Sequence, residues 1–333
     1  MSQIFFKRPK YIPSGIFRLL GKAGFQAVDL HFHTEYGMDS VSRITETLRK
    51  CQQKGIGVAI TDHNEVRGAE KAWRLRKSVF VIPGIEVSAM RGVHSLYFFS
   101  RIGDCRSFFS DVVRPLRKKN PFFLPIALEE LMEKARDYNA FISVPHPYGP
   151  GVIGIKKVRF PKLRMRRLER HFDLVEALNA ANLRRMNERA LRWARFIRKP
   201  MTAGSDGHTT AELGKALTLA YGSDIESYFA SLRKGLSILM GKEQNIVIDA
   251  FHELVKQKKY FREARAMGKG LFWVKEHTRE FERLGEKLRR LERKAKHPGS
   301  LFHSTEAQRQ RHLRHYKEYL KLGGSMFRGK VME

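Results

Sequence analysis

Short apolar segments alternate with longer amphipathic stretches between residues 27 and 203, and this rhythm constrains the fold more than any other feature of the 333-residue chain. The segments predicted as strands are 28–31, 57–60, 79–82, 95–99, 141–144, 174–177 and 201–203. The stretches predicted as helices are 43–54, 69–77, 128–138 and 185–197. Strands that alternate with helices indicate parallel βα units. Seven such strands favour a closed or nearly closed α/β barrel.

The character of the sequence changes twice, which divides the chain into three parts. Residues 1–26 form a basic lead-in, and residues 27–240 carry the strand–helix rhythm. Residues 241–333 predict a basic α-helical extension, with apolar residues such as Val247, Phe251 and Leu254 at helical spacing. Three interpretations of the extension stay open: a buttress against the barrel, an arm that forms a homo-oligomer, and an RNA- or DNA-binding arm.

The chain is strongly basic, with 64 Lys and Arg residues against 34 Asp and Glu and a formal net charge of +30. Such an excess indicates attraction to nucleic acid, phosphorylated metabolites or an acidic membrane surface. A basic surface that is merely solvated is the alternative. The two cysteines, Cys51 and Cys105, offer no disulfide framework, so we expect a cytoplasmic protein. No apolar run approaches the ~20 residues of a membrane span, so we expect no transmembrane segment.

Polar side chains gather at the ends of six of the seven predicted strands. His31 and His33 lie one residue apart at the end of the first strand. Residues i and i+2 of a strand point to the same side, so both imidazoles can face one metal ion. In α/β barrels the carboxyl ends of the strands build the functional site. His94 departs from this pattern, because it opens its predicted strand instead of following it.

Six motifs together resemble the polymerase-and-histidinol-phosphatase (PHP) superfamily of metal-dependent phosphoesterases, and they occur in the order typical of that family. The motifs are DLHFHT (29–34), AITDHN (59–64), PGIEVS (83–88), VHSLYFF (93–99), PHP (145–147) and GSDGH (204–208). The resemblance extends from about residue 28 to residue 235. It implies a distorted seven-stranded, TIM-like α/β barrel that holds up to three metal ions. The chain is too short for the DNA polymerases in which such a domain is embedded.

Carried over by position, the resemblance implies three groups of metal ligands. The first group is His31, His33, Glu86 and Asp206. The second group is Asp39, His63 and His208. The third group is His94 and His146, with Glu86 bridging back to the first metal. One departure concerns Asp39, because the loop before it is one residue longer than the common form and has Gly37 where serine is usual.

Mixed histidine and carboxylate ligands suit Mn²⁺, Zn²⁺ or Fe²⁺ and do not favour Ca²⁺ or Mg²⁺. The cofactors expected are therefore two or three divalent ions of these kinds. Such ions lower the pKa of water, and the resulting hydroxide can attack phosphorus without a serine or cysteine nucleophile. Asp62 and Arg184 are the candidate catalytic residues beside the ligands. Asp62 precedes a ligand and can orient it, although a turn or helix cap is an equal alternative.

Arginine pairs bidentately with phosphate, so basic residues near the strand ends are candidates for substrate binding. These residues are Arg67, Arg164, Arg166 and Arg167. We predict that the segment 156–170 forms a basic lip beside the metals.

The sequence therefore predicts a phosphoesterase whose partner is a phosphorylated small molecule, a nucleotide or the end of a single-stranded nucleic acid. The alternative is a noncatalytic, basic nucleic-acid-binding module on the same barrel. Metal content separates the two hypotheses, because a pure binding module has no need of two or three metal ions.

Overall fold

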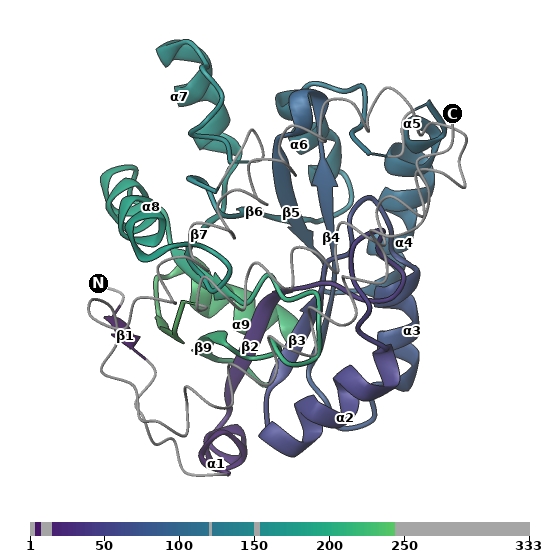
Figure 1. The fold of residues 1–333 in the computed structure, drawn as a ribbon, viewed down its shortest axis with the longest axis vertical. Helices are drawn as coiled ribbons and strands as arrows, with labels where there is room; N and C mark the ends of the chain where they lie inside the picture. Colours follow the sequence, from purple (N-terminus) through teal and green to yellow (C-terminus); the bar gives the residue numbers. More distant parts are fainter. Residues whose placement is uncertain (1–3, 8–14, 120–121, 150–153, 244–333) are drawn as a thin grey trace, which may run out of the picture. The chain divides into compact units, whose positions relative to one another are not determined.

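The computed structural model describes residues 4–7, 15–119, 122–149 and 154–243. From residue 244 onward the predicted helical extension, and with it the predicted oligomerisation arm, lies outside the described residues. The described part is an α/β fold built on one ten-stranded sheet (Figure 1). Its strands are β1 (Ile4–Lys7), β2 (Phe25–Phe32), β3 (Gly57–Ile60), β4 (Val81–Ser88), β5 (His94–Phe98), β6 (Phe141–Val144), β7 (Leu174–Asn179), β8 (Met201–Gly204), β9 (Ala216–Tyr221) and β10 (Ser237–Gly241).

The order of strands in the sheet is β1-β10-β9-β2-β3-β4-β5-β6-β7-β8. The seven predicted strands correspond to β2 through β8, so the expected count of seven is corrected to ten by the addition of β1, β9 and β10. The predicted parallel pairing holds for β2 with β3, β3 with β4, β6 with β7 and β7 with β8, but not for the whole sheet. Strand β5 runs antiparallel to both of its neighbours, β4 and β6, and β9 runs antiparallel to β2 and β10.

The sheet nearly closes on itself, because the end of β2 meets the segment that follows β8. The backbone N–H of Asp206 donates to the carbonyl of His31 over 2.8 Å. The N–H of His33 donates to the carbonyl of Gly207 over 2.9 Å. These bonds bring the first and last motifs, which are about 170 residues apart in the sequence, to the same edge of the sheet.

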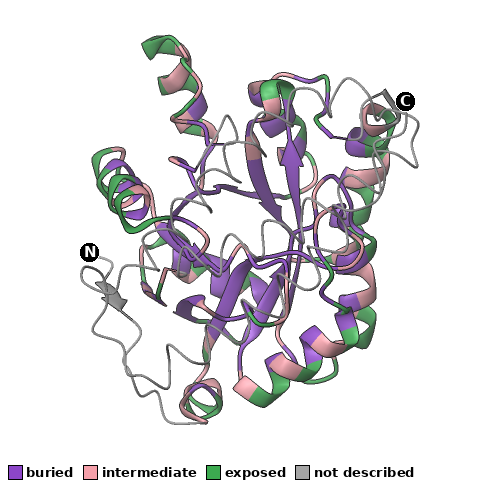
Figure 2. Ribbon diagram, viewed as in Figure 1, coloured by how far each residue is buried: buried purple, intermediate pink, exposed green. Residues whose placement is uncertain are grey.

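Helices cover the outside of the sheet and present exposed faces to solvent (Figure 2). Helix α2 shows why these segments are helical: Ile44, Thr47, Leu48 and Cys51 are buried at helical spacing, and the helix ends at Gly55 in a left-handed conformation with φ 66°. The helices are α1 (Ile16–Lys22), α2 (Ile44–Lys54), α3 (Arg67–Leu75), α4 (Ile102–Phe108), α5 (Arg114–Lys119), α6 (Leu128–Arg136), α7 (Lys162–His171), α8 (Arg184–Phe196) and α9 (Ile225–Arg233), with a 3₁₀ turn at Met90–Gly92 and a π-helical turn at Phe109–Val113.

An apolar core fills the end of the barrel opposite the polar motifs. Phe229 of α9 stacks on Phe141, the first residue of β6, with ring centroids 4.2 Å apart. It also packs on Phe98, the last residue of the antiparallel strand β5. Each buried phenylalanine of this kind stabilises the fold by roughly 1.5–3 kcal/mol. Helix α9 therefore plugs one end of the barrel and leaves the other end to the histidines and carboxylates.

Among the described residues, no helix combines the length and the apolar character needed to cross a bilayer.

Candidate metal centre

The antiparallel direction of β5 explains the position of His94. This residue opens β5 and pairs with Ser88 at the carboxyl end of β4. The start of β5 therefore lies at the same edge of the sheet as the carboxyl ends of the parallel strands. Among the described residues, four overlapping groups of side chains lie close enough together to hold a metal ion. Each of the nine predicted ligands belongs to at least one of these groups. These residues are His31, His33, Asp39, His63, Glu86, His94, His146, Asp206 and His208.

The carboxylate of Glu86 lies at the centre of the cluster, 1% exposed. One of its oxygens, Oε2, lies 3.2 Å from Nε2 of His31. The other, Oε1, lies 2.9 Å from Nδ1 of His94. In all, five imidazole nitrogens approach this carboxylate to within 3.4 Å. They belong to His31, His33, His63, His94 and His146.

Two aspartates flank this centre. Oδ1 of Asp206 lies 3.3 Å from Nε2 of His33. Oδ2 of Asp39 lies 2.9 Å from Nε2 of His208 and 3.3 Å from Nε2 of His63. The carboxylate of Asp39 therefore lies in the cluster, although the loop before it is longer than the common form. The ring of His33 stacks on that of His208 with centroids 4.3 Å apart, so the groups around Asp39 and Glu86 are contiguous.

The backbone at two of these residues adopts a conformation that L-amino acids rarely take. His146 has φ 27° and Asp206 has φ 51°. Left-handed conformations of residues other than glycine cost of order 1–3 kcal/mol and occur where the surrounding structure imposes them. Here the strain lies at the turns that aim two candidate ligands at the cluster.

The bonding state of the cluster fits a bound cation. Among the described residues, eight buried side-chain N or O atoms lack a hydrogen-bond partner, and six of them belong to candidate ligands. The six atoms are Nδ1 and Nε2 of His33, Oδ1 of Asp39, and Nδ1 of His63, His94 and His146. Buried polar atoms are nearly always paired, so this concentration indicates a partner of another kind. Imidazole nitrogens and carboxylate oxygens suit a divalent transition metal.

Burial and neighbouring charges shift the pKa values of the clustered histidines in opposite directions. Burial lowers the pKa of His33 to about 3, and the neighbouring His208 adds to this effect. Burial likewise lowers the pKa of His94 to about 4. Burial also disfavours the protonated form of His63. The carboxylates of Glu86 and Asp39 stabilise that form more strongly and raise the pKa of His63 to about 9. Burial alone would raise the pKa of Glu86, yet His63 and the other histidines hold it well below its usual range.

A second layer of buried groups holds the candidate ligands, and the sequence reasoning missed its main member, Glu176. Oε1 of Glu176 lies 3.1 Å from Nδ1 of His31, and Oε2 accepts from the backbone N–H of His146 over 2.8 Å. Asn179 donates from Nδ2 both to Glu176 and to Asp206. The available signal was a charged residue in the middle of the apolar run of β7, every residue of which is buried.

Asp62, a candidate catalytic residue, holds the loop that follows β2. Its two carboxylate oxygens accept from the backbone N–H of Thr34 over 2.5 Å and from the Thr34 hydroxyl over 2.6 Å. Burial raises the pKa of Asp62 to about 7, against the effect of these two hydrogen bonds. Through Thr34, Asp62 orients the backbone next to His33.

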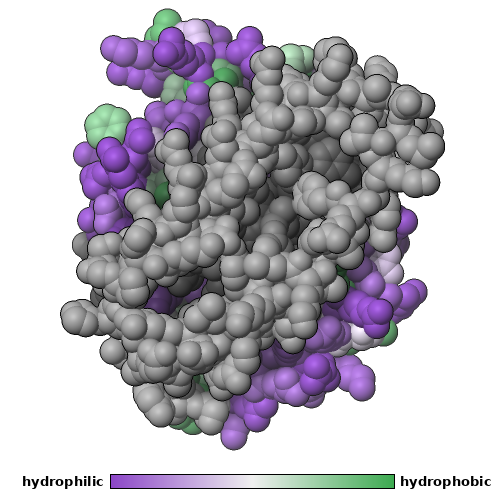
Figure 3. All heavy atoms as spheres, viewed as in Figure 1, coloured by the Kyte–Doolittle hydropathy of each residue, from purple (hydrophilic) through white to green (hydrophobic). Residues whose placement is uncertain are grey.

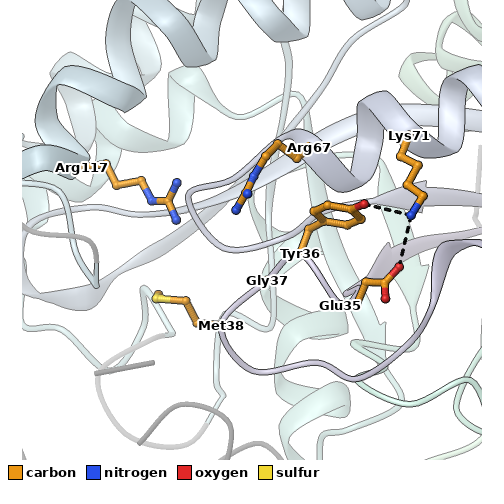
Figure 4. A pocket seen from close by; sticks show the side chains of 7 residues that line it. All are labelled: Glu35, Tyr36, Gly37, Met38, Arg67, Lys71 and Arg117. Carbon is orange, nitrogen blue, oxygen red and sulfur yellow. Dashed lines mark hydrogen bonds and ion pairs between the residues drawn. The ribbon is translucent and has the colours of Figure 1, made fainter. Parts of the chain in front are cut away.

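Arg67 lies in a basic pocket beside the loop that leads to Asp39. The pocket has a volume of about 360 Å³ and is lined by Glu35, Tyr36, Gly37, Met38, Arg67, Lys71 and Arg117 (Figure 4). Arg67 and Arg117 both pair with Glu65, over 2.8 and 2.9 Å. Lys71 donates to the Tyr36 hydroxyl over 2.9 Å. Three cations and the carboxylate of Glu35 thus line a space next to the cluster.

The remaining predicted arginines lie on α7 and α8. Arg164 makes a two-pronged ion pair with Glu129 of α6, over 2.5 and 2.9 Å. Arg166 and Arg167 are exposed on the same helix. The guanidinium of Arg184 is half-exposed and lies 3.8 Å from Glu243. The structure therefore brings Arg67 next to the cluster, where it pairs with Glu65, and it pairs Arg164 with Glu129.

The fold and the cluster define an α/β-barrel protein with a candidate multinuclear metal centre, and comparison with known proteins identifies the family. The PHP domain model matches residues 29–181, and a PHP-associated model matches residues 184–236. Together they cover more than half of the chain. The chain belongs to the PHP family, which confirms the resemblance drawn from its motifs.

Three proteins are similar to this chain, one in sequence and two in structure. An uncharacterized protein of Methanocaldococcus jannaschii, MJ1587, is 30% identical over 135 residues, which is 37% of this chain and 68% of the relative. A two-domain protein of Bacteroides vulgatus, described as containing a predicted PHP-like metal-dependent phosphoesterase, has a TM-score of 0.51 at 14% identity, with 77% of this chain and 73% of that chain covered. The lesion-specific endonuclease Q of Pyrococcus furiosus has a TM-score of 0.51 at 18% identity, with 65% and 57% covered. The two structures share the fold.

Proposed function

We propose that this protein hydrolyses phosphate esters with two or three divalent metal ions held by the nine clustered residues. The family assignment supports phosphoester hydrolysis in general terms. The observation that carries the proposal for this chain is the buried Glu86 carboxylate, which five imidazole nitrogens approach to within 3.4 Å. A carboxylate in this position can bridge adjacent cations.

The three ligand groups implied by the motifs are supported by the side chains that lie together. His31, His33 and Glu86 form one compact group, to which Asp206 is adjacent through His33. Asp39, His63 and His208 form a second group, which His33 also adjoins. Glu86 lies next to both His94 and His146, the proposed third group. Divalent ions held by these residues would lower the pKa of water and neutralise charge on a phosphate ester.

The residues of the chain itself supply orientation, exclusion of water and charge. Glu176 accepts from Nδ1 of His31 and so turns the other nitrogen toward Glu86. The cluster is almost wholly buried, which strengthens every electrostatic interaction within it. Arg67, Lys71 and Arg117 line the neighbouring pocket and provide positive charge for substrate phosphate.

The substrate class that we favour is nucleic acid or a multiply phosphorylated molecule. The net charge of +30 supports a polyanionic substrate. One structural relative acts as an endonuclease, which is compatible with this choice. A monophosphorylated metabolite is the simpler alternative, and it would leave most of the basic surface without a catalytic purpose. Mn²⁺, Zn²⁺ and Fe²⁺ are the ions that the ligand set suits best.

Hydrolysis by the Mn²⁺-loaded protein tests the proposal. The substrates are a panel of phosphomonoesters, nucleotides, and 5′-labelled single-stranded DNA and RNA. We expect hydrolysis that is lost in the His31→Ala/His33→Ala variant and kept in Gln52→Ala, which alters an exposed side chain of α2 outside the cluster. If the protein binds no metal and hydrolyses none of these esters, the proposal is wrong and the noncatalytic binding module is the better account.

A further inference from the structure

Helices α7 and α8 concentrate positive charge on one side of the barrel. Together they span 23 residues, and these residues hold just over a quarter of the net charge of +30. Ten cations stand against the two carboxylates Glu169 and Glu188. The cations are Lys162, Arg164, Arg166, Arg167 and Arg170 on α7, and Arg184, Arg185, Arg189, Arg192 and Arg195 on α8. Figure 3 shows hydrophilic side chains along both helices.

Aromatic rings are interleaved with these charges at α8. A shallow pocket of about 320 Å³ is lined by Tyr148, Arg189, Arg192, Trp193 and Phe196. Phe196 is 84% exposed at the end of the helix. The guanidinium of Arg189 lies 4.5 Å from the centre of the Tyr148 ring. Aromatic faces next to guanidinium groups bind bases by stacking and phosphates by charge, without a requirement for sequence.

The pocket adjoins segments that build the metal centre. Tyr148 lies two residues after His146, and the strand β6 that ends before them pairs with β7. The next helix along the chain after β7 is α8, and β7 carries Glu176 and Asn179, which support the cluster. A chain of nucleotides bound along α8 is therefore close in the fold to the carboxyl ends of β6 and β7.

We infer that the α7–α8 surface binds single-stranded nucleic acid. This surface consists of the two helices and of the pocket that Tyr148 and Phe196 line. A base stacks on Tyr148 and Phe196, and Arg189 and Arg192 bind the phosphates on either side. A single strand fits better than a duplex, because stacking on a protein ring requires a base that is free of its own stack. The role of this surface in delivering substrate rests on the proposed function, whereas binding itself does not.

Fluorescence anisotropy with a labelled 20-nucleotide single strand tests the inference. The full-length protein is kept in EDTA so that no cleavage occurs. We expect Phe196→Ala to weaken binding by about 5- to 150-fold, the range of one lost stacking contact. We expect Arg189→Ala/Arg192→Ala to reduce the slope of log K against log salt by about 1.4, which corresponds to two lost phosphate contacts.

The matched control is Arg49→Glu, which reverses an exposed charge on α2, away from the surface. It is expected to change affinity by less than twofold, and thermal melts will verify that every variant is folded. The inference is overturned if Phe196→Ala binds like wild type, if Arg49→Glu loses as much affinity, or if a duplex of equal length binds more tightly. Loss of binding in Phe196→Ala together with no hydrolysis of any ester by the Mn²⁺-loaded wild type would support this surface and contradict the proposed function.

Discussion

Nδ1 of His31 lies 3.1 Å from Oε1 of Glu176, and the exposure of the two side chains is 0% and 2%. When this nitrogen carries the proton, Nε2 presents its lone pair to Oε2 of Glu86, 3.2 Å away. Two electron-rich atoms at this distance need a cation or a proton between them. The pair His31–Glu176 therefore sets the side of the imidazole that faces the candidate metal centre.

The first prediction concerns Glu176. The variant Glu176→Gln keeps the shape of the side chain but removes the charge that orients His31. Outer-shell partners of metal-ligating histidines typically contribute 10- to 100-fold to metal affinity, and we expect a loss in that range. Mn²⁺ titration calorimetry measures it. Glu188→Gln, which alters an exposed carboxylate of α8, is the control; equal affinities in the two variants would contradict the role of Glu176.

The second prediction concerns Glu86 and metal removal. A chelator should lower the melting temperature, because a ligand present at 100 times its Kd stabilises the folded state by about 2.7 kcal/mol. Added Mn²⁺ should restore it. In Glu86→Gln the central carboxylate is lost, so we expect fewer bound metal ions per chain by elemental analysis and a hydrolysis rate reduced by at least about 100-fold. A melting temperature that is the same with and without the chelator would contradict a metal centre.

The third prediction concerns Gly204, the last residue of β8. A Cβ atom at this position would clash with Cβ of His31 and lie 2.8 Å from Oε1 of Glu176. Because neither neighbour can move without disturbing the cluster, Gly204→Ala should lower the free energy of unfolding by about 1–3 kcal/mol and weaken metal binding. The control Gly103→Ala places a methyl group where no atom lies within 4 Å. Urea denaturation measures the free energy of unfolding of both variants.

The fourth prediction separates the arginines of α7. Charge reversal of Arg164, Arg166 and Arg167 together should raise KM with little change in kcat. We expect most of the increase from Arg166→Glu/Arg167→Glu, because Glu129 already neutralises Arg164. Steady-state kinetics of the double variant and of Arg164→Glu measure how much each contributes to the increase in KM. An unchanged KM in the triple variant would exclude the predicted basic lip.

The fifth prediction concerns the two cysteines. Burial raises the pKa of the Cys51 and Cys105 thiols, so the reactive thiolate is scarce at every pH below that raised value. In the folded protein at pH 8 both thiols should react with a disulfide reagent far more slowly than free cysteine. In denaturant both should react at once. Rapid labelling of the native protein would show that these segments open readily.

Much of the fold was readable from local patterns. All seven predicted strands form, and the predicted helices overlap α2, α3, α6 and α8 with shifts of at most two residues at either end. Apolar periodicity determines such elements because the buried face of a strand or helix must be apolar. Eight of the nine clustered histidines and carboxylates lie in the six short motifs, while Asp39 lies on the loop that follows β2.

Tertiary structure decided what depends on contacts between distant segments. Strand direction is one example: local sequence did not reveal that β5 is antiparallel, and only pairing with β4 brings His94 beside Glu86. The strands β9 and β10 are another, because their short apolar runs become strands by pairing with β2 and with each other. The sequence by itself therefore determined seven of the strands, four of the helices and the types of candidate ligand. Which side chains meet was decided by the closure of the sheet, because a buried group such as Glu176 acquires its role from partners up to 145 residues away.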